Sequence, residues 1–238
     1  MSELPVLYQD THLIAVAKPS GLLVHRSKLD VHDNDNVLKK LREQTGLFLY
    51  PVHRLDKPTS GVLLFALDSD SARSISQQFE RQLVTKHYLA VVRGYTDKAG
   101  TIDHAIRDRD ARTPQRNPAQ TSYQRLATIE LPHRIDRYPT TRYSLLKVKP
   151  DTGRRHQIRQ HMKHIKHPII GDTSYGKALH NQFFAKLYHC HRLLLHAQHL
   201  EILHPLNGKL VRINSNPGAE FKSVLSDPRW QWQDRQHR

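Results

Sequence analysis

The sequence predicts one folded unit of the α+β class, in which strands outnumber helices. Its 238 residues are enough to bury a hydrophobic core, and we find no internal repeat or linker between domains. Apolar runs typical of strands recur along the chain with few helical patterns between them, which is compatible with a mixed, mostly antiparallel sheet flanked by helices. We therefore treat residues 1–238 as a single domain.

The charge balance favours an anionic partner. Lys and Arg number 37 against 22 Asp and Glu, which gives a net charge of +15, and there are 18 His besides. Nucleic acid is the commonest partner of so basic a chain. The single cysteine, Cys190, excludes an intrachain disulfide, and no apolar run approaches the roughly 18 residues of a membrane span. With no signal region in the first ten residues, we expect a cytoplasmic protein without a membrane partner.

Alternating or continuous apolar runs predict the strands, and turn residues bound them. The predicted strands lie at 6–8, 13–17, 61–66, 86–94, 122–131, 141–148, 193–202 and 209–213. Three segments have helical spacing: 37–44, which Gly46 stops, a helix capped by Ser69 or Asp70 and running through Leu83, and 181–188. Residues 107–120 are charged and proline-containing, which predicts a flexible loop, and the tail at 227–238 is expected to dock loosely.

The stretch from His53 to Gly61 (His-Arg-Leu-Asp-Lys-Pro-Thr-Ser-Gly) places the carboxylate of Asp56 between cations in a turn. Pro58 and the Ser-Gly pair keep it out of regular structure, and a buried strand follows directly. Residues held in this way are often functional. On local grounds alone, a capped turn with solvated charges is the simpler explanation of the pattern.

Tyr88 lies on the predicted strand at 86–94, where alternation places it on one face with Ala90 and Val92. Its ring is thus directed inward, as a core aromatic or as part of a site. A second informative region begins at Asp151. A helix opening at Thr152 or Gly153 would bury Ile158, Met162 and Ile165.

The adjoining face of that helix would carry only cations, namely Arg155, Arg159, Lys163 and Lys166. Like charges on one face repel each other, so an anion is expected beside them, either an internal carboxylate or a phosphate chain. This predicts contact with nucleic acid, although a solvated basic helix would show the same pattern.

Taken together, these regions resemble the RluA family of pseudouridine synthases. Four motifs of that family occur in order: Lys18-Pro19-x-Gly21 with Val24-His25, His53 to Gly61, Thr152 to Asp172, and Leu195-His196-Ala197-x-x-Leu200 before His204-Pro205. They span nearly the whole chain. The resemblance implies the pseudouridine synthase fold, an α+β domain with a mixed, mostly antiparallel sheet and a central catalytic cleft. It also implies no S4-type RNA-binding domain, for which there is no space ahead of Lys18.

The resemblance also implies roles for individual residues. Asp56 would act as nucleophile or as base toward the ribose, Arg159 would pair with it, and Tyr88 would stack on the uracil and help remove the C5 proton. Leu193 would wall the base pocket, and Arg54 would fill the space that the extruded base leaves. The other expected RNA contacts are Lys18, Arg154, Arg155, His156 and Lys163. The reaction needs no cofactor and no metal.

Within the family, three stretches are most similar to the synthases that modify uridine 65 of tRNA. They are 24–27, Arg137 to Tyr143, and Lys166 before His167-Pro168. Most relatives have proline in place of Arg26 and glycine in place of Lys166. We therefore expect tRNA as the partner and a monomeric enzyme.

Three other functions remain open. A related synthase could act on ribosomal RNA or on the tRNA anticodon stem-loop. The His189-Cys190-His191 run would fit a metal-dependent RNA hydrolase, although alternate strand residues are often only packed. A non-catalytic RNA-binding protein would explain the charge but not Asp56 and Tyr88 together.

Overall fold

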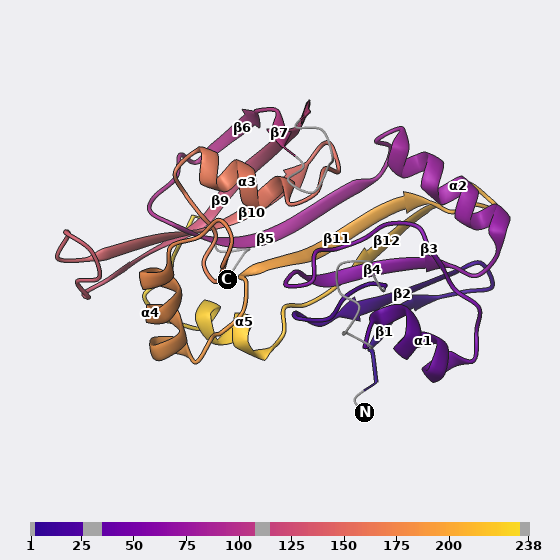
Figure 1. Ribbon diagram of the computed structural model, residues 1–238, viewed down its shortest axis with the longest axis horizontal. Coiled ribbons are helices and arrows are strands. Elements are labelled where there is room, and N and C mark those ends of the chain that lie inside the picture. The colour runs from indigo at the N-terminus through magenta and orange to yellow at the C-terminus, as the bar shows by residue number, and fades with distance from the viewer. Residues whose placement is uncertain (1–2, 26–34, 108–114, 234–238) are drawn as a thin grey trace. The chain divides into compact units, whose positions relative to one another are not determined.

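The computed structural model describes residues 3–25, 35–107 and 115–233, which form two compact units (Figure 1). The first unit comprises Met1–Lys86 with Ala197–Pro217, and the second comprises His87–His196 with Gly218–Arg238. The chain passes from one unit to the other within β5 (Thr85–Arg93), within β11 (Leu195–Leu203) and again between Pro217 and Gly218. A single domain over the whole chain stays a prediction.

The first unit contains a sheet whose central strand, β4, pairs antiparallel with β2 and is buried on both faces. Such a strand reads as a continuous apolar run rather than an alternating one. The strands of this sheet are β1 (Val6–Gln9), β2 (Leu13–Lys18), β3 (Tyr50–Pro51), β4 (Ser60–Ala66), the later part of β11, and β12 (Leu210–Asn214). The order is β1-β2-β4-β11, with β3 paired to β4 and β12 to β11.

Two helices belong to this unit, α1 (Val37–Thr45) and α2 (Ser69–Glu80). The end of α1 at Gly46 is as predicted, because this residue adopts the left-handed conformation that glycine favours. The predicted ends of α2 are wrong by a few residues. Asp68 caps the helix by accepting the Ser71 N–H at 2.8 Å, and the chain turns at Gln82 (φ 58), which leaves Leu83 exposed.

The second unit is built on four antiparallel strands in the order β5-β10-β9-β13. Their bounds are Thr85–Arg93 for β5, Thr141–Pro150 for β10, Gln120–Leu131 for β9 and Gln231–Trp232 for β13. The short strand β6 (Ala99–Asp103) also pairs with β9. Its helices are α3 (Gln157–His164), α4 (Ala178–Tyr188) and α5 (Ala219–Leu225).

Helices cover both faces of β5, and the alternation of its side chains separates two hydrophobic clusters. Leu89 and Val91 pack in one cluster with residues of α4 and α5. Ala90 and Val92 pack in the other with residues of α3, and Tyr88 joins them. The predicted direction of Tyr88 is therefore confirmed.

Three sequence expectations need correction in this unit. The ends of the 107–120 segment are ordered as a hairpin of β7 (Ile106–Arg107) and β8 (Arg116–Asn117), while 108–114 lie outside the described residues. The tail does not dock loosely, because Trp230 is buried and donates its indole N–H to the Val224 carbonyl at 2.7 Å. β13 then extends the sheet, and the last five residues are not described.

The third correction concerns the basic helix, which begins at Gln157 rather than at Thr152 or Gly153. The buried amide of Gln157 accepts the Thr152 hydroxyl and the Arg154 N–H, and this holds the preceding residues in a turn. Arg155 thus precedes the helix and Lys166 follows it. The α+β class is confirmed, and no helix within the described ranges has the length and apolar character needed to cross a membrane.

Candidate active site

Asp56 lies at the start of a tight turn in the first unit. The Thr59 N–H donates to the Asp56 carbonyl at 3.0 Å, and the side chain of Asp56 is partly buried. The turn leads straight into β4, whose Gly61 has a φ of 116° and lies against the backbone of Ala197 on β11. A Cβ at this glycine would come within 2.1 Å of the Ala197 carbonyl oxygen, so only glycine permits this approach.

Residues 18–21, which form the first of the four sequence motifs, hydrogen-bond to this turn and hold it in place. The Gly21 N–H and the Lys18 ammonium both donate to the Lys57 carbonyl, at 2.9 and 3.0 Å. The Ser20 hydroxyl donates to the Pro58 carbonyl at 2.7 Å. Two segments almost 40 residues apart in the sequence therefore hold the residues after Asp56 in place.

The placement of Lys18 does not match the expectation that it contacts RNA. Its side chain is only 1% exposed, and its ammonium donates to the carbonyls of Pro19 and Lys57. Burial of a lysine requires such partners, since the desolvated charge is otherwise costly. This placement makes Lys18 a support of the Asp56 turn rather than a surface cation.

His53 anchors the other side of the turn. Its Nε2 accepts the Leu64 N–H at 2.9 Å, and its ring stacks on Phe79 with centroids 4.8 Å apart. Burial, with the nearby charge of Lys86, lowers the pKa of His53 to about 3, so the ring is neutral and can accept. Arg54, the next residue, is exposed, as its predicted role in RNA requires.

In the second unit, Tyr88 and Leu193 lie in one cluster. Tyr88 is partly buried and pairs across the strands with Val148, while Leu193 is 1% exposed. Ile158 and Met162 of α3 complete the apolar surroundings. A partly exposed ring with such a backing can stack on a nucleobase.

Arg159 is buried, in contrast to the exposed basic face predicted for its helix. Its guanidinium donates from Nε and Nη2 to the two carboxylate oxygens of Asp172, at 2.8 and 2.9 Å. Burial alone would raise the pKa of Asp172, but the hydrogen bonds and charge of Arg159 outweigh this and keep it below its usual range. The ring of Tyr175 lies 5.1 Å from the guanidinium carbon.

The remaining predicted RNA contacts lie around α3. Arg154, Arg155 and Lys163 are exposed. His156, at the N-cap of α3, is partly buried and adopts a φ of 55°, with its Nδ1 3.1 Å from the Tyr175 hydroxyl. His156 is thus fixed in position, whereas the three cations can reach a phosphate backbone.

Sequence reasoning did not identify Asp172 and Tyr175 as the residues that contact the guanidinium of Arg159. Asp172 is the one acidic residue between Asp151 and Glu201, yet it was not named as the anion expected beside the basic helix. That scarcity of acids was the available signal. Asp56 belongs to the first unit, whereas Tyr88, Arg159 and Leu193 belong to the second, so their assembly into one site stays a prediction.

The histidines near Cys190 do not form a strand. His189 is exposed and ends α4 in the left-handed conformation, while Cys190 is buried. Within the described part of the chain, no three His, Cys, Asp or Glu side chains are grouped so that they could hold a metal ion.

The sequence matches a family model described as RNA pseudouridylate synthase over residues 12–164. The chain is 47% identical to tRNA pseudouridine synthase C of Pectobacterium carotovorum subsp. carotovorum, over 95% of this chain and 62% of that relative. It is 46% identical to tRNA pseudouridine synthase C of Yersinia pestis, over 95% of this chain and 91% of that relative.

A solved structure, human RNA pseudouridylate synthase domain containing 4, is similar with a TM-score of 0.74 and 25% identity. The similarity covers 97% of this chain and 95% of the human one. The model match covers more than half of the chain, and the relatives are well above 30% identity. The chain therefore belongs to the RNA pseudouridylate synthase family.

Proposed function

We propose that the protein isomerises uridine to pseudouridine in tRNA, at uridine 65. The observation that carries the proposal is the set of hydrogen bonds by which residues 18–21 hold the Asp56 turn just ahead of β4. The substrate class is supported by relatives 41% to 47% identical that bear the name tRNA pseudouridine synthase C. The position within tRNA is supported by the resemblance of residues 137–143 and Lys166 to the synthases that modify uridine 65.

The reaction breaks the bond from ribose C1′ to N1, turns the uracil and joins it again through C5, and the proton lost from C5 is matched by one gained at N1. Atoms and electrons balance without a co-reactant. Asp56 is the residue that acts on the uridine, either as a nucleophile or as a base toward the ribose. Its turn geometry fixes the position of the carboxylate before substrate arrives, which lowers the entropic cost of the reaction.

Tyr88 supplies the surface on which the uracil stacks, with Leu193 behind it. Its hydroxyl is the group that helps to remove the C5 proton after the base has turned. Arg159 orients Asp56 in this mechanism. Its Nε and Nη2 donate to Asp172, and this pair holds the guanidinium in a fixed orientation.

The uridine lies in a folded RNA and must leave its stack before it can react, with Arg54 filling the vacancy. The exposed cations Arg154, Arg155 and Lys163 bind the phosphate backbone. Such contacts give affinity that depends on salt and not on sequence. Because the substrate is tRNA, we expect the enzyme to act in the cytoplasm. We also expect it to be a monomer and to need no cofactor. Sedimentation of the purified protein tests whether it is a monomer.

The proposal is tested by incubating the purified protein with an unmodified tRNA transcript and mapping pseudouridine along it. A ribosomal RNA fragment and an anticodon stem-loop serve as parallel substrates. Pseudouridine at position 65 alone supports the proposal. Modification of either parallel substrate in place of position 65 contradicts the assignment within tRNA, and no pseudouridine in any RNA contradicts the activity.

A further inference from the structure

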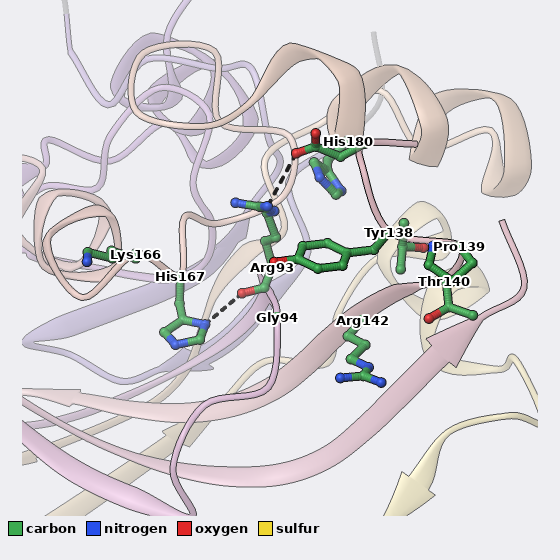
Figure 2. Close-up of a pocket in the computed structure, with 11 residues that line it drawn as sticks. Arg93, Gly94, Tyr138, Pro139, Thr140, Arg142, Lys166, His167 and His180 are labelled. Atoms are coloured by element: carbon green, nitrogen blue, oxygen red, sulfur yellow. Dashed lines mark hydrogen bonds and ion pairs between the residues drawn. The ribbon is translucent and has the colours of Figure 1, made fainter. Parts of the chain in front are cut away.

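A cavity of about 360 Å³ lies in the second unit, where β5 ends (Figure 2). Its walls are Arg93 and Gly94, Asp136 and residues 138–140 of the β9–β10 connection, Thr141 and Arg142 of β10, Lys166, His167 and the buried His180 of α4. Its volume falls within the range of pockets that hold small molecules or single nucleotides. All of these residues belong to one unit and to the described part of the chain.

This cavity is separate from the surroundings of Tyr88. Arg93 follows Tyr88 by five residues on β5, which corresponds to about 17 Å at a rise of about 3.3 Å per residue. Because side chains alternate along a strand, Arg93 also points to the opposite face from Tyr88. One uridine cannot occupy both places.

The cavity brings together the two described stretches that set the sequence apart within its family. Residues 138–142 form one wall, and Lys166 lines the cavity beside His167. Lys166 has a φ of 66°, a conformation that glycine adopts without strain and lysine does not. A lysine at a strained position is often functional, and here its charge is the property that glycine would lack. Arg26, the third distinguishing residue, lies outside the described residues.

Cations outnumber acids in the cavity wall. Arg93 is 3.6 Å from Asp136, and Arg142 is 3.3 Å from Glu130, so both of these arginines have carboxylate partners. The ammonium of Lys166 makes no hydrogen bond or ion pair with any residue that the structure describes. The net positive charge of the wall favours an anionic ligand, with Lys166 as its first contact.

The floor of the cavity offers polar atoms that no residue satisfies. Nε2 of His180 and Oγ1 of Thr141 are buried, and neither has a hydrogen-bond partner within the described ranges. The other ring nitrogen of His180 is 2.8 Å from the Tyr143 hydroxyl, and burial lowers the pKa of His180 to about 4. Buried polar atoms are rarely left unpaired, and a ligand that supplies the missing partners would explain these two.

An aromatic side chain completes the wall. Tyr138 is 54% exposed, and Figure 2 shows its ring directed toward Arg93 from the opposite side of the cavity. The guanidinium of Arg137 stands 4.8 Å from the ring centroid. Exposed tyrosines beside cations provide the stacking surfaces on which single bases bind.

We propose that this cavity binds one nucleotide of the RNA substrate, other than the uridine that is isomerised. Its base stacks on Tyr138, its phosphate pairs with Lys166, and polar atoms of the base or ribose bond His180 and Thr141. The inference rests on the proposed function for the identity of the RNA. A nucleotide in an RNA chain is favoured over a free one because the exposed Arg134 and Arg137 extend the positive charge beyond the cavity.

Lys166→Gly is the sharpest variant, because it removes the charge and relieves the strained backbone at the same time. Its folding should be intact, so weaker binding can be attributed to the lost ammonium. Lys166→Ala removes the same charge and keeps the strain. Lys186→Ala, an exposed lysine on α4 away from the cavity, is the matched control for loss of one charge.

Binding of the full chain to a tRNA transcript is measured as a function of salt. For both Lys166 variants we expect weaker binding and a decrease of about 0.7–0.9 in the slope of log affinity against log salt, the value for one phosphate. Tyr138→Ala should weaken binding about 5- to 150-fold, while Tyr138→Phe should keep it. In turnover assays these changes should raise KM and leave kcat nearly unchanged.

If the Lys166 and Tyr138 variants bind tRNA as tightly as Lys186→Ala, with the same salt slope, the proposal is overturned. It is also overturned if adenosine or uridine monophosphate binds at this cavity with a Tyr138-dependent affinity while tRNA binding is unaffected, since the ligand would then be a free nucleotide. The proposed function is judged separately. It fails only if the unchanged protein forms no pseudouridine in tRNA, whatever the variants bind.

Discussion

The guanidinium of Arg159 donates two hydrogen bonds to the carboxylate of Asp172, from Nε to Oδ2 at 2.8 Å and from Nη2 to Oδ1 at 2.9 Å. Both side chains are almost inaccessible to water. The same carboxylate accepts the N–H groups of Ser174 and Tyr175, so one buried acid fixes both α3 and the segment after it. A buried pair of this kind is costly to break from one side, because the remaining charge has no partner.

Asp172→Asn should therefore lower the free energy of unfolding by about 3–5 kcal/mol. Chemical denaturation followed by circular dichroism measures the change. Glu201→Gln is the control, because Glu201 pairs with Arg212 at 2.8 Å on an exposed surface, where the loss should stay below about 1 kcal/mol. Equal losses in the two variants would contradict the structural role of the Arg159–Asp172 pair.

Protonation of His53 should make the first unit less stable in acid. Its pKa is about 3 in the folded protein, against about 6.5 when unfolded. Between these values the unfolded state binds more protons, so this stability is fully present above about pH 6.5 and is lost as the pH falls toward 3. In this range the free energy of unfolding should fall by up to about 1.4 kcal/mol for each pH unit, the value for uptake of one proton.

His53→Gln tests this slope, because the amide oxygen can still accept the Leu64 N–H but cannot titrate. Unfolding midpoints in urea between pH 4 and pH 7 should change less with pH in this variant than in the unchanged protein. A parallel decline in both proteins would assign the acid sensitivity to other groups, such as His180, whose pKa burial lowers to about 4.

Gly61 is predicted to tolerate no side chain. Gly61→Ala should cost about 3 kcal/mol or more, since overpacking against Ala197 and the positive φ each cost about 1–3 kcal/mol. Gly208→Ala is the matched control, because it also has a positive φ but nothing within 4 Å of its added Cβ. Thermal unfolding of both variants separates the two costs, and similar midpoints would contradict the close approach of β4 and β11.

Tyr88→Phe keeps the ring and removes only the hydroxyl. We expect tRNA binding to remain and turnover to fall strongly, because the proton at C5 can no longer be moved. Binding is measured by filter retention and turnover by release of tritium from uridine labelled at C5. Product formation at the original rate would return Tyr88 to the role of a packed aromatic.

Patterns that depend on near neighbours could be predicted from the sequence. The alternation in β5 placed Tyr88 with Ala90 and Val92, as the hydrophobic clusters confirm, and the glycine at 46 gave the end of α1. The cation-rich segment around Arg159 correctly indicated that an anion lies close by. Apolar runs and turn residues reflect local burial, so they gave the positions of β1, β2, β4, β5, β9, β10, β11 and β12, while β3, β6, β7, β8 and β13 were not predicted.

Long-range partners could not be predicted in this way. Arg159 is buried because Asp172, 13 residues further on, folds back against it, and helical periodicity carries no signal of that return. Lys18 is buried because two carbonyls accept its ammonium, one of them from Lys57. Trp230 docks because α5 offers the Val224 carbonyl. Each outcome depends on which segments meet in space rather than on local spacing.

The central claim is that Asp56 carries out the isomerisation of uridine in tRNA. The most direct test compares Asp56→Asn with the unchanged protein in the release of tritium from a tRNA transcript labelled at uridine C5. Asp70→Asn, an exposed acid in the first turn of α2, serves as the control. We predict that Asp56→Asn binds the transcript and releases no tritium above background, while the control matches the unchanged protein. Tritium release by Asp56→Asn at an undiminished rate would contradict the account.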